Sequence, residues 1–229
     1  MPPSHELIDA LNEHFGTPVL NHPKDPLSEL IFTILSQNTT DTNRDRAYER
    51  LRSRFPRWRD VLEADREEVE EAIRIGGLGR QKSSRIQEIL RTINRHRGDL
   101  SMDYLKEMSI EEARQELLSF TGVGKKTAAI VLLFSLGRPA FPVDTHVHRV
   151  GKRLGLIPEN MSADAAHDVM ERLVPPRHYY DFHVNLIRLG RAVCGPRRTS
   201  CEVCPARYWC PTGLKKNEAS ENVIPSTPD

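Results

Sequence analysis

The chain has 229 residues, of which 38% are hydrophobic and 28% charged, and its formal net charge is only +1. This balance is typical of a globular chain that can bury a core, and no apolar run is long enough to cross a membrane. The opening stretch MPPSHELIDALNEHFG combines acidic residues with a helical period. It therefore argues against a signal or transit peptide, and we expect a cytoplasmic protein that is not secreted.

The pattern is helical from the first residues onward. Apolar residues repeat at spacings of three to four from Leu7 to Phe15 and from Leu27 to Ile34. Asp41 is the expected start of the next helix, and residues 67–75 predict a short helix that Gly76 ends. No segment shows the alternation of a strand. The sequence therefore predicts an all-α fold.

Residues 128–136, AAIVLLFSL, are apolar on nearly every side. This segment is too short to cross a membrane, and it predicts a helix buried in the middle of a bundle. The tail from Lys215 to Asp229 is polar and is expected to be poorly ordered.

Two segments concentrate positive charge on this near-neutral chain. Residues 74–97 hold seven Lys or Arg against one acid, and residues 177–216 hold eight against two. Such clustering is typical of a surface that meets the phosphates of nucleic acid. A solvated helix surface would give the same counts, so charge alone leaves both interpretations open.

A glycine hairpin, Gly122-Val123-Gly124, separates a predicted helix over 110–119 from the apolar helix. Glycines permit unusual backbone dihedrals and a close approach by another molecule. The N–H groups at the start of the second helix, with Lys125 beside them, can then bind a backbone phosphate without reading a base. A tight turn between two packed helices is the alternative.

Lys126 and Asp144 are the candidate catalytic residues. Lys126 falls in the first turn of the apolar helix, where the positive end of the helix dipole favours a free amine over an ammonium group. A free amine is a nucleophile that can form a Schiff base. Asp144 follows Pro142 and precedes renewed apolar periodicity, so we expect it to cap a helix. As a carboxylate it could also accept a proton or stabilise a developing cation.

The four cysteines of the chain all lie within seventeen residues, at Cys194, Cys201, Cys204 and Cys210. Four thiolates this close in sequence can converge on one centre, and a tetrahedral sulfur site suits zinc or an iron–sulfur cluster. Two disulfides are the alternative, and they would suit a small secreted scaffold better than this chain.

Taken together, these motifs resemble the endonuclease III family of DNA glycosylases, in the helix–hairpin–helix superfamily. The resemblance covers roughly residues 5 to 212. It is carried by the hairpin with Lys126, by the segment Val143-Asp144-Thr145-His146 and by the cysteine spacing. It implies that the four cysteines bind a 4Fe-4S cluster rather than zinc.

The family implies two helical lobes with a DNA groove between them. One lobe, over residues 24–135, would be a six-helix barrel that includes the helix–hairpin–helix at 110–136. The other would combine residues 1–23 with 136–212 and carry the cluster, and residues 213–229 would form a flexible tail. The partner would be double-stranded DNA with damaged bases or abasic sites, bound by a monomer.

The family's chemistry implies a bifunctional glycosylase and AP lyase that acts on oxidised pyrimidines. Lys126 would attack C1′ of the damaged nucleotide and expel the base, with Asp144 as its activator and electrostatic partner. The resulting Schiff base would permit β-elimination, which cuts the strand on the 3′ side of the lesion. The target base must leave the stack, which is easiest for damaged pairs.

Three loops match the segments of this family that touch DNA. Residues 77–82 resemble a loop whose apolar residue wedges into the duplex, with Leu78 as the wedge. The position of a glutamine that fills the vacated base space holds Asn38, and Gln37 comes one residue earlier, so the gap-filling residue is left open. Arg197 and Arg198, between two cluster ligands, would bind phosphate.

Three other activities are alternatives. Related glycosylases for mismatched adenine or thymine lack a lysine at the position of Lys126, which argues against a mismatch activity. A glycosylase for pyrimidine dimers or another lesion stays open, because one sequence does not identify the residues of a base pocket. A DNA-binding module without catalysis would need neither Lys126 nor Asp144.

Overall fold

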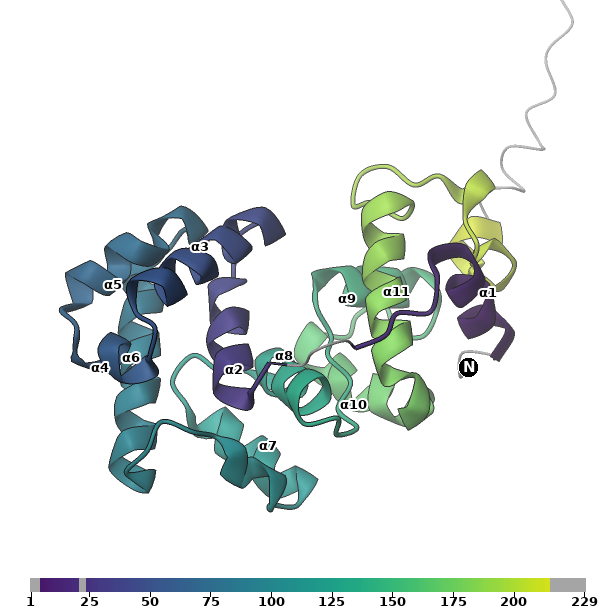
Figure 1. The fold of residues 1–229 in the computed structure, drawn as a ribbon. Coiled ribbons are helices and arrows are strands. Elements are labelled where there is room, and N and C mark those ends of the chain that lie inside the picture. Colours follow the sequence, from purple (N-terminus) through teal and green to yellow (C-terminus); the bar gives the residue numbers. More distant parts are fainter. Residues whose placement is uncertain (1–4, 21–23, 215–229) are drawn as a thin grey trace, which may run out of the picture. The chain divides into compact units, whose positions relative to one another are not determined.

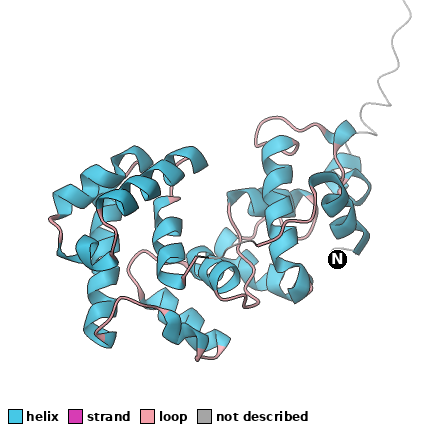
Figure 2. Ribbon diagram, viewed as in Figure 1, coloured by secondary structure: helices cyan, strands magenta, loops and turns pink. Residues whose placement is uncertain are grey.

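The computed structural model describes residues 5–20 and 24–214, and across these ranges the chain is helical without a β-strand (Figures 1 and 2). The predicted all-α fold is confirmed. None of the described helices has the length and apolar character that a bilayer crossing requires. The prediction for Lys215 to Asp229 lies outside the described residues. The α-helices are α1 (His5–Phe15), α2 (Pro26–Leu35), α3 (Asp41–Arg54), α4 (Trp58–Glu63), α5 (Arg66–Ile73), α6 (Gly79–Arg97), α7 (Ile110–Ser119), α8 (Lys125–Ile130), α9 (Thr145–Arg153), α10 (Ala163–Leu173) and α11 (Tyr179–Ala192).

The chain divides into two compact units. One unit comprises residues 22–139 and holds α2 to α8. The other combines residues 1–21 with residues 140–229 and holds α1 and α9 to α11. In this second unit α11 packs against both α1 and α9, which brings the N-terminal helix to a partner far along the chain.

Helix α2 lies at the centre of the unit over residues 22–139. All of its residues except Phe32 are buried, and it packs against α3, α6 and α8. Its start follows from local chemistry, because Asp25 Oδ1 accepts a hydrogen bond from Ser28 N at 2.9 Å and Pro26 needs no N–H partner in the first turn. The loop over residues 36–40 follows directly after its last residue, Leu35.

The apolar segment over 128–136 is a buried helix, as predicted, but it is not a regular α-helix throughout. Helix α8 gives way to a π-helical turn over Val131–Ser135. Ala128, Ala129 and Leu132 are buried, whereas Lys126 in the first turn of α8 is half-buried. The deep part of this helix therefore anchors a first turn that stays accessible.

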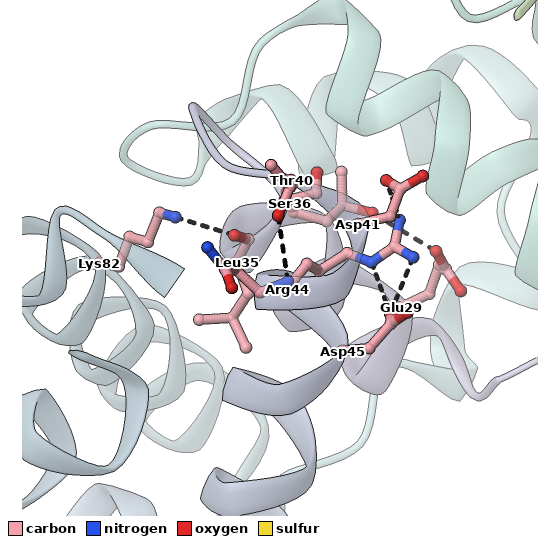
Figure 3. A network of polar contacts seen from close by, with 10 residues as sticks. Glu29, Leu35, Ser36, Thr40, Asp41, Arg44, Asp45 and Lys82 are labelled. Carbon is pink, nitrogen blue, oxygen red and sulfur yellow. Dashed lines mark hydrogen bonds and ion pairs between the residues drawn. The ribbon is translucent and has the colours of Figure 1, made fainter. Parts of the chain in front are cut away.

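Helix α3 starts at Asp41, as expected, and the residue before it supplies the cap. Thr40, not Asp41, is the N-cap, and its Oγ1 accepts from Asn43 N at 3.3 Å. Asp41 is the first helical residue instead. Its carboxylate pairs with Arg44 at 3.0 Å, and Arg44 also pairs with Asp45 at 2.8 Å (Figure 3). These pairs fix the chain direction just after the loop over 36–40.

Candidate functional site

The two glycines of the hairpin between α7 and α8 are present for different reasons. Gly122 has φ +79, in the left-handed region that favours glycine. Val123 between them is buried, and its N–H donates to Phe120 O at 3.1 Å, which closes the turn. Gly124 has an ordinary φ of −103, and a Cβ built there would meet nothing within 4 Å. Neither strain nor packing requires a glycine at 124, so its bare backbone leaves room for another molecule.

Lys126 stands in the first turn of α8, directly beyond that open space. Gly124 precedes the helix without a side-chain cap, so no side chain of the N-cap occupies the N-terminal end. Helix N–H groups and the helix dipole both favour an anion at such a position. The hairpin therefore combines an anion-binding backbone with a lysine amine in one turn of helix.

Asp144 caps α9, as predicted. Its Oδ1 accepts from Val147 N at 2.7 Å, and Oδ2 has no hydrogen-bond partner among the described residues. The capping bond fixes the carboxylate at the start of α9 and leaves its second oxygen able to accept a proton or face a cation.

Two buried histidines hold the extended segment that leads to Asp144. Val143 N donates to His167 Nε2 at 3.1 Å, and His183 Nδ1 bonds to Pro142 O at 2.9 Å. His167 Nδ1 also lies 3.0 Å from Ala163 O. Because Nε2 accepts and Nδ1 donates, His167 must be the neutral tautomer that carries its proton on Nδ1. The backbone before Asp144 is thus fixed by side chains from α10 and α11.

Asn38 and Leu78 are both exposed and both have left-handed backbone conformations. Their φ values are 52 and 53, and among the described residues they are the two non-glycine positions with positive φ. Such a conformation costs a residue other than glycine about 1–2 kcal/mol. Leu78 is 46% exposed, an unusual place for a large apolar side chain, and a Cβ on Gly77 would lie 3.9 Å from Asn38 O. The two strained loop tips are therefore neighbours.

Lys82 connects the bases of these two loops through hydrogen bonds of its amine. Its side chain is 1% exposed, and Nζ donates to Leu35 O at 2.8 Å (Figure 3). The same Nζ also donates to Gly76 O at 2.8 Å. Leu35 ends α2 just before the Asn38 loop, and Gly76 lies two residues before Leu78. Burial lowers the pKa of Lys82 to about 8. A buried amine thus satisfies two carbonyl groups that would otherwise lack partners at the base of both tips.

This burial predicts a pH-dependent contribution to stability. Between the folded pKa of about 8 and the ordinary value of 10.5, the unfolded chain binds a proton at Lys82 that the folded chain does not. Stability should therefore rise with pH across this window, by up to about 3 kcal/mol. In Lys82→Met this rise should vanish. Urea unfolding at pH 7.5 and pH 10 measures it, with the exposed Lys106→Met as control. Parallel pH dependences in wild type and Lys82→Met would contradict the assignment.

Gln37 is engaged with the hairpin rather than extended from its loop. Its Nε2 donates to Gly122 O at 3.5 Å, and its Oε1 accepts from Arg85 Nη1 at 2.9 Å. Asn38 beside it is exposed and makes no such bridge. Of the two candidates for filling a vacated base space, Asn38 is therefore the one whose side chain is available.

The four cysteines line one small cavity in the C-terminal segment, together with Arg153 and Thr199. All four are free and half-buried. Burial, and after it the neighbouring thiols, raises the pKa of Cys204 to about 11, and burial raises the pKa of Cys210. Within the described part of the chain, no three His, Cys, Asp or Glu side chains are placed closely enough to hold a metal ion.

The donor set nevertheless fits a sulfur-ligated metal centre. Four thiols on one cavity repel each other once ionised, and a bound cation supplies the charge that stabilises thiolates. The segment over residues 194–214 has little core of its own, because Ala206 and Gly213 are its only buried described residues. A chain segment of this kind needs a cross-link to hold its shape.

Two arginines of α9 hold the loop over residues 194–199. Arg149 donates from Nη2 to Gly190 O at 2.7 Å and from Nε to Cys194 O at 3.2 Å. Arg153 Nη1 donates to Gly195 O at 2.7 Å and contacts Cys194 Sγ at 3.1 Å. Arg197 and Arg198 are exposed at the tip of this loop. Their guanidinium groups are thus presented on a fixed backbone.

Sequence reasoning missed four residues that position the candidate site: Lys82, Arg85, His167 and His183. Lys82 and Arg85 looked like members of a basic surface. The histidines lie far from Asp144 in sequence, and no motif marks them. A residue pattern along one helix cannot reveal a partner on another helix, so no signal in this sequence identifies these four.

Comparison with known proteins assigns the chain to a family. Residues 31–176 match the model of the HhH-GPD superfamily base excision DNA repair protein. The chain belongs to this superfamily. It is 34% identical over 191 residues to Endonuclease III of Thermotoga maritima, covering 83% of this chain and 85% of that protein. The resemblance to the endonuclease III family is confirmed, and the chain is a base excision repair enzyme of this type.

A further sequence relative and two solved structures are also similar to the chain. A DNA glycosylase-type protein of Arabidopsis thaliana is 36% identical over 203 residues, which cover 89% of this chain and 63% of that protein. Among solved structures, a non-covalent Endonuclease III–DNA complex matches with a TM-score of 0.78 and 30% identity, over 92% of this chain and 95% of that one. A thermostable thymine-DNA glycosylase matches with a TM-score of 0.76 and 25% identity, over 92% and 94%. Two proteins with different names therefore share this fold with the chain.

Proposed function

We propose that the protein is a bifunctional DNA glycosylase and AP lyase that removes oxidised pyrimidines from duplex DNA. The observation that carries the proposal is Lys126 in the first turn of α8, directly after the uncapped and open backbone at Gly124. A phosphate bound at the hairpin would bring the adjoining sugar to a lysine amine. A protein that only bound DNA would have no use for a nucleophile there.

The proposed reaction joins two steps. The amine of Lys126 attacks C1′, the C1′–N bond breaks, and the base leaves with the electron pair and takes up a proton. Asp144 accepts the proton that the amine loses and stabilises the cationic character at the sugar. The lone pair of the bound nitrogen then opens the sugar ring, so that the C1′–O4′ bond breaks, O4′ takes up a proton and a protonated Schiff base forms. This Schiff base acidifies C2′, so that loss of a C2′ proton expels the 3′ phosphate. Hydrolysis of the imine finally regenerates the lysine.

Several described residues have proposed DNA contacts. The hairpin backbone from Gly122 to Gly124, with Lys125, binds phosphate without reading a base, and Arg197 and Arg198 bind the backbone elsewhere. Leu78 enters the stack as the target base leaves it, and Asn38 fills the vacated space. The strained tips at Asn38 and Leu78 are in keeping with these roles, since backbone strain persists where the surroundings or a function impose it.

We further propose that Cys194, Cys201, Cys204 and Cys210 bind a 4Fe-4S cluster. The support is the set of four thiols on one cavity and the small core of the segment that carries them. The cluster would cross-link the segment and so present Arg197 and Arg198. It takes no part in the proposed reaction.

A panel of labelled duplexes tests the substrate. The duplexes contain thymine glycol, a G·T mismatch, an abasic site or no lesion, and base release and strand cleavage are measured separately. We expect release and cleavage with thymine glycol, cleavage with the abasic site, and neither with the mismatch. Release of thymine from the mismatch without cleavage would instead indicate a monofunctional mismatch enzyme, and one structural neighbour is named a thymine-DNA glycosylase.

Replacing Asp144 by asparagine separates its two roles. Asparagine caps helices about as well as aspartate, so the melting temperature should stay within a few degrees of wild type. Asparagine cannot accept a proton, and base release should fall by roughly 10²–10⁴-fold. The matched control is Asp25→Asn, which changes the N-cap of α2 in the same way and should leave base release unaltered. Unchanged base release in Asp144→Asn would remove Asp144 from the reaction.

A further inference from the structure

Helix α6 carries a cationic groove that the proposed reaction does not use. The groove has a volume of about 550 Å³ and is lined by Arg66, Arg80, Gln81, Ser84 and Arg85. The last four lie on α6 as two adjacent pairs, 80/81 and 84/85, that are four residues apart, so the pairs lie one above the other on the same side of the helix. Arg66 comes from α5, which packs against α6. All five residues belong to the unit over residues 22–139.

Two of the three arginines have no carboxylate within ion-pair distance in the part of the chain that the structure describes. Arg66 pairs with Glu67 at 3.5 Å. Neither Arg80 nor Arg85 has a carboxylate partner in the described ranges, and the hydrogen bond of Arg85 goes to the neutral amide of Gln37. Groups of unpaired guanidinium ions repel one another, and a phosphate relieves that repulsion while accepting from both.

Arg85 connects this groove to the glycine hairpin. A Cβ built on Gly122 would lie 2.7 Å from both Cδ and Nε of Arg85, so the arginine side chain lies directly against the glycine. Gln37 bridges the same two residues through its amide. The absence of a side chain at Gly122 therefore makes room for Arg85 and also permits the left-handed backbone of the turn. The side chain of Arg85 therefore packs against the hairpin and also lines the groove.

We infer that this groove is a second phosphate-binding site, which extends the DNA contact of the hairpin along α6. The groups that bind are the guanidinium groups of Arg80 and Arg85 and the hydroxyl of Ser84. The bound ligand is a phosphodiester of the DNA backbone. These groups position the duplex and do not read its sequence. The inference rests on the proposed function in one respect, that the protein binds DNA.

The salt dependence of DNA binding tests this site. The affinity for a duplex with one abasic site is measured between 50 and 300 mM KCl for wild type, Arg80→Gln and Arg85→Gln. Each lost phosphate contact should lower the slope of log K against log[salt] by about 0.9. Arg80→Gln is the cleaner variant, because Arg80 makes no contact that the fold needs. Arg91→Gln is the control, since it removes the same charge from the same helix outside the groove, where Arg91 pairs with Glu88.

The outcomes separate the groove from the proposed function. Slopes reduced in Arg80→Gln and Arg85→Gln but unchanged in Arg91→Gln support the groove. Strong, salt-dependent binding by wild type with all three variants alike would overturn the groove and leave the proposed function intact. A wild-type protein that does not bind the duplex at all would overturn both.

Discussion

Replacing Lys126 by glutamine should abolish strand cleavage while leaving DNA binding in place. Glutamine keeps most of the length of the side chain but has no nucleophilic amine, so no Schiff base forms and β-elimination cannot follow. We expect cleavage of an abasic duplex to fall by at least about 10⁴-fold relative to wild type, since no other group would carry the covalent step. The affinity for the same duplex should change by less than about tenfold, because Lys126 is one charge among many phosphate contacts.

The neighbouring lysine provides the matched control for this prediction. Lys125→Gln removes the same charge from the same turn of α8 but leaves the proposed nucleophile intact. It should weaken binding modestly and retain strand cleavage at saturating enzyme. Cleavage lost in Lys125→Gln and kept in Lys126→Gln would exchange the two assignments. Cleavage kept in both would eliminate lysine chemistry at the hairpin.

Replacing Cys201 by serine should remove the iron and unfold the C-terminal segment. Wild-type protein should contain about four iron atoms per chain, and the variant almost none, because a hard hydroxyl is a poor substitute for a thiolate. A bound metal centre contributes on the order of 10 kcal/mol to the folding of small segments with little core. Residues 194–214 should therefore become sensitive to protease in the variant, and the melting temperature should drop.

Ser200→Ala controls for any change next to this cysteine and should keep both the iron and the protease resistance. Metal analysis of the purified wild-type protein gives the decisive numbers. Stoichiometric zinc with no iron would contradict the cluster but keep a four-cysteine metal site. Equal iron and equal melting temperatures in wild type and Cys201→Ser would contradict a structural cluster at these residues.

The helices and their start signals were predictable because they depend on residues close in sequence. Pro142 and the periodicity after Thr145 correctly placed Asp144 as an N-cap. The apolar run over 128–136 correctly predicted a buried helix, although its π-helical turn has no signal in the pattern. Asp41 correctly marked the start of α3, whereas its cap, Thr40, was not identified, since Thr40 and Asp41 are both good capping residues and the sequence does not choose between them.

Interactions between distant elements could not be predicted. Counting charges placed Lys82 on a basic surface, whereas the fold buries it against carbonyl groups from α2 and from the turn before α6. Arg85 reaches Gly122 across 37 positions of sequence, and His167 reaches Val143 across 24. Each of these contacts is decided by how helices pack, and periodicity along a single helix reports only which face is buried.

The most direct test of the catalytic account is to identify the amine that bonds to DNA. Wild-type protein is incubated with an abasic duplex in the presence of borohydride, which reduces a Schiff base to a stable bond, and the adduct is digested and sequenced by mass spectrometry. The account predicts one covalent adduct, on Lys126. An adduct on another lysine, or no adduct from a protein that binds the duplex tightly, would contradict it.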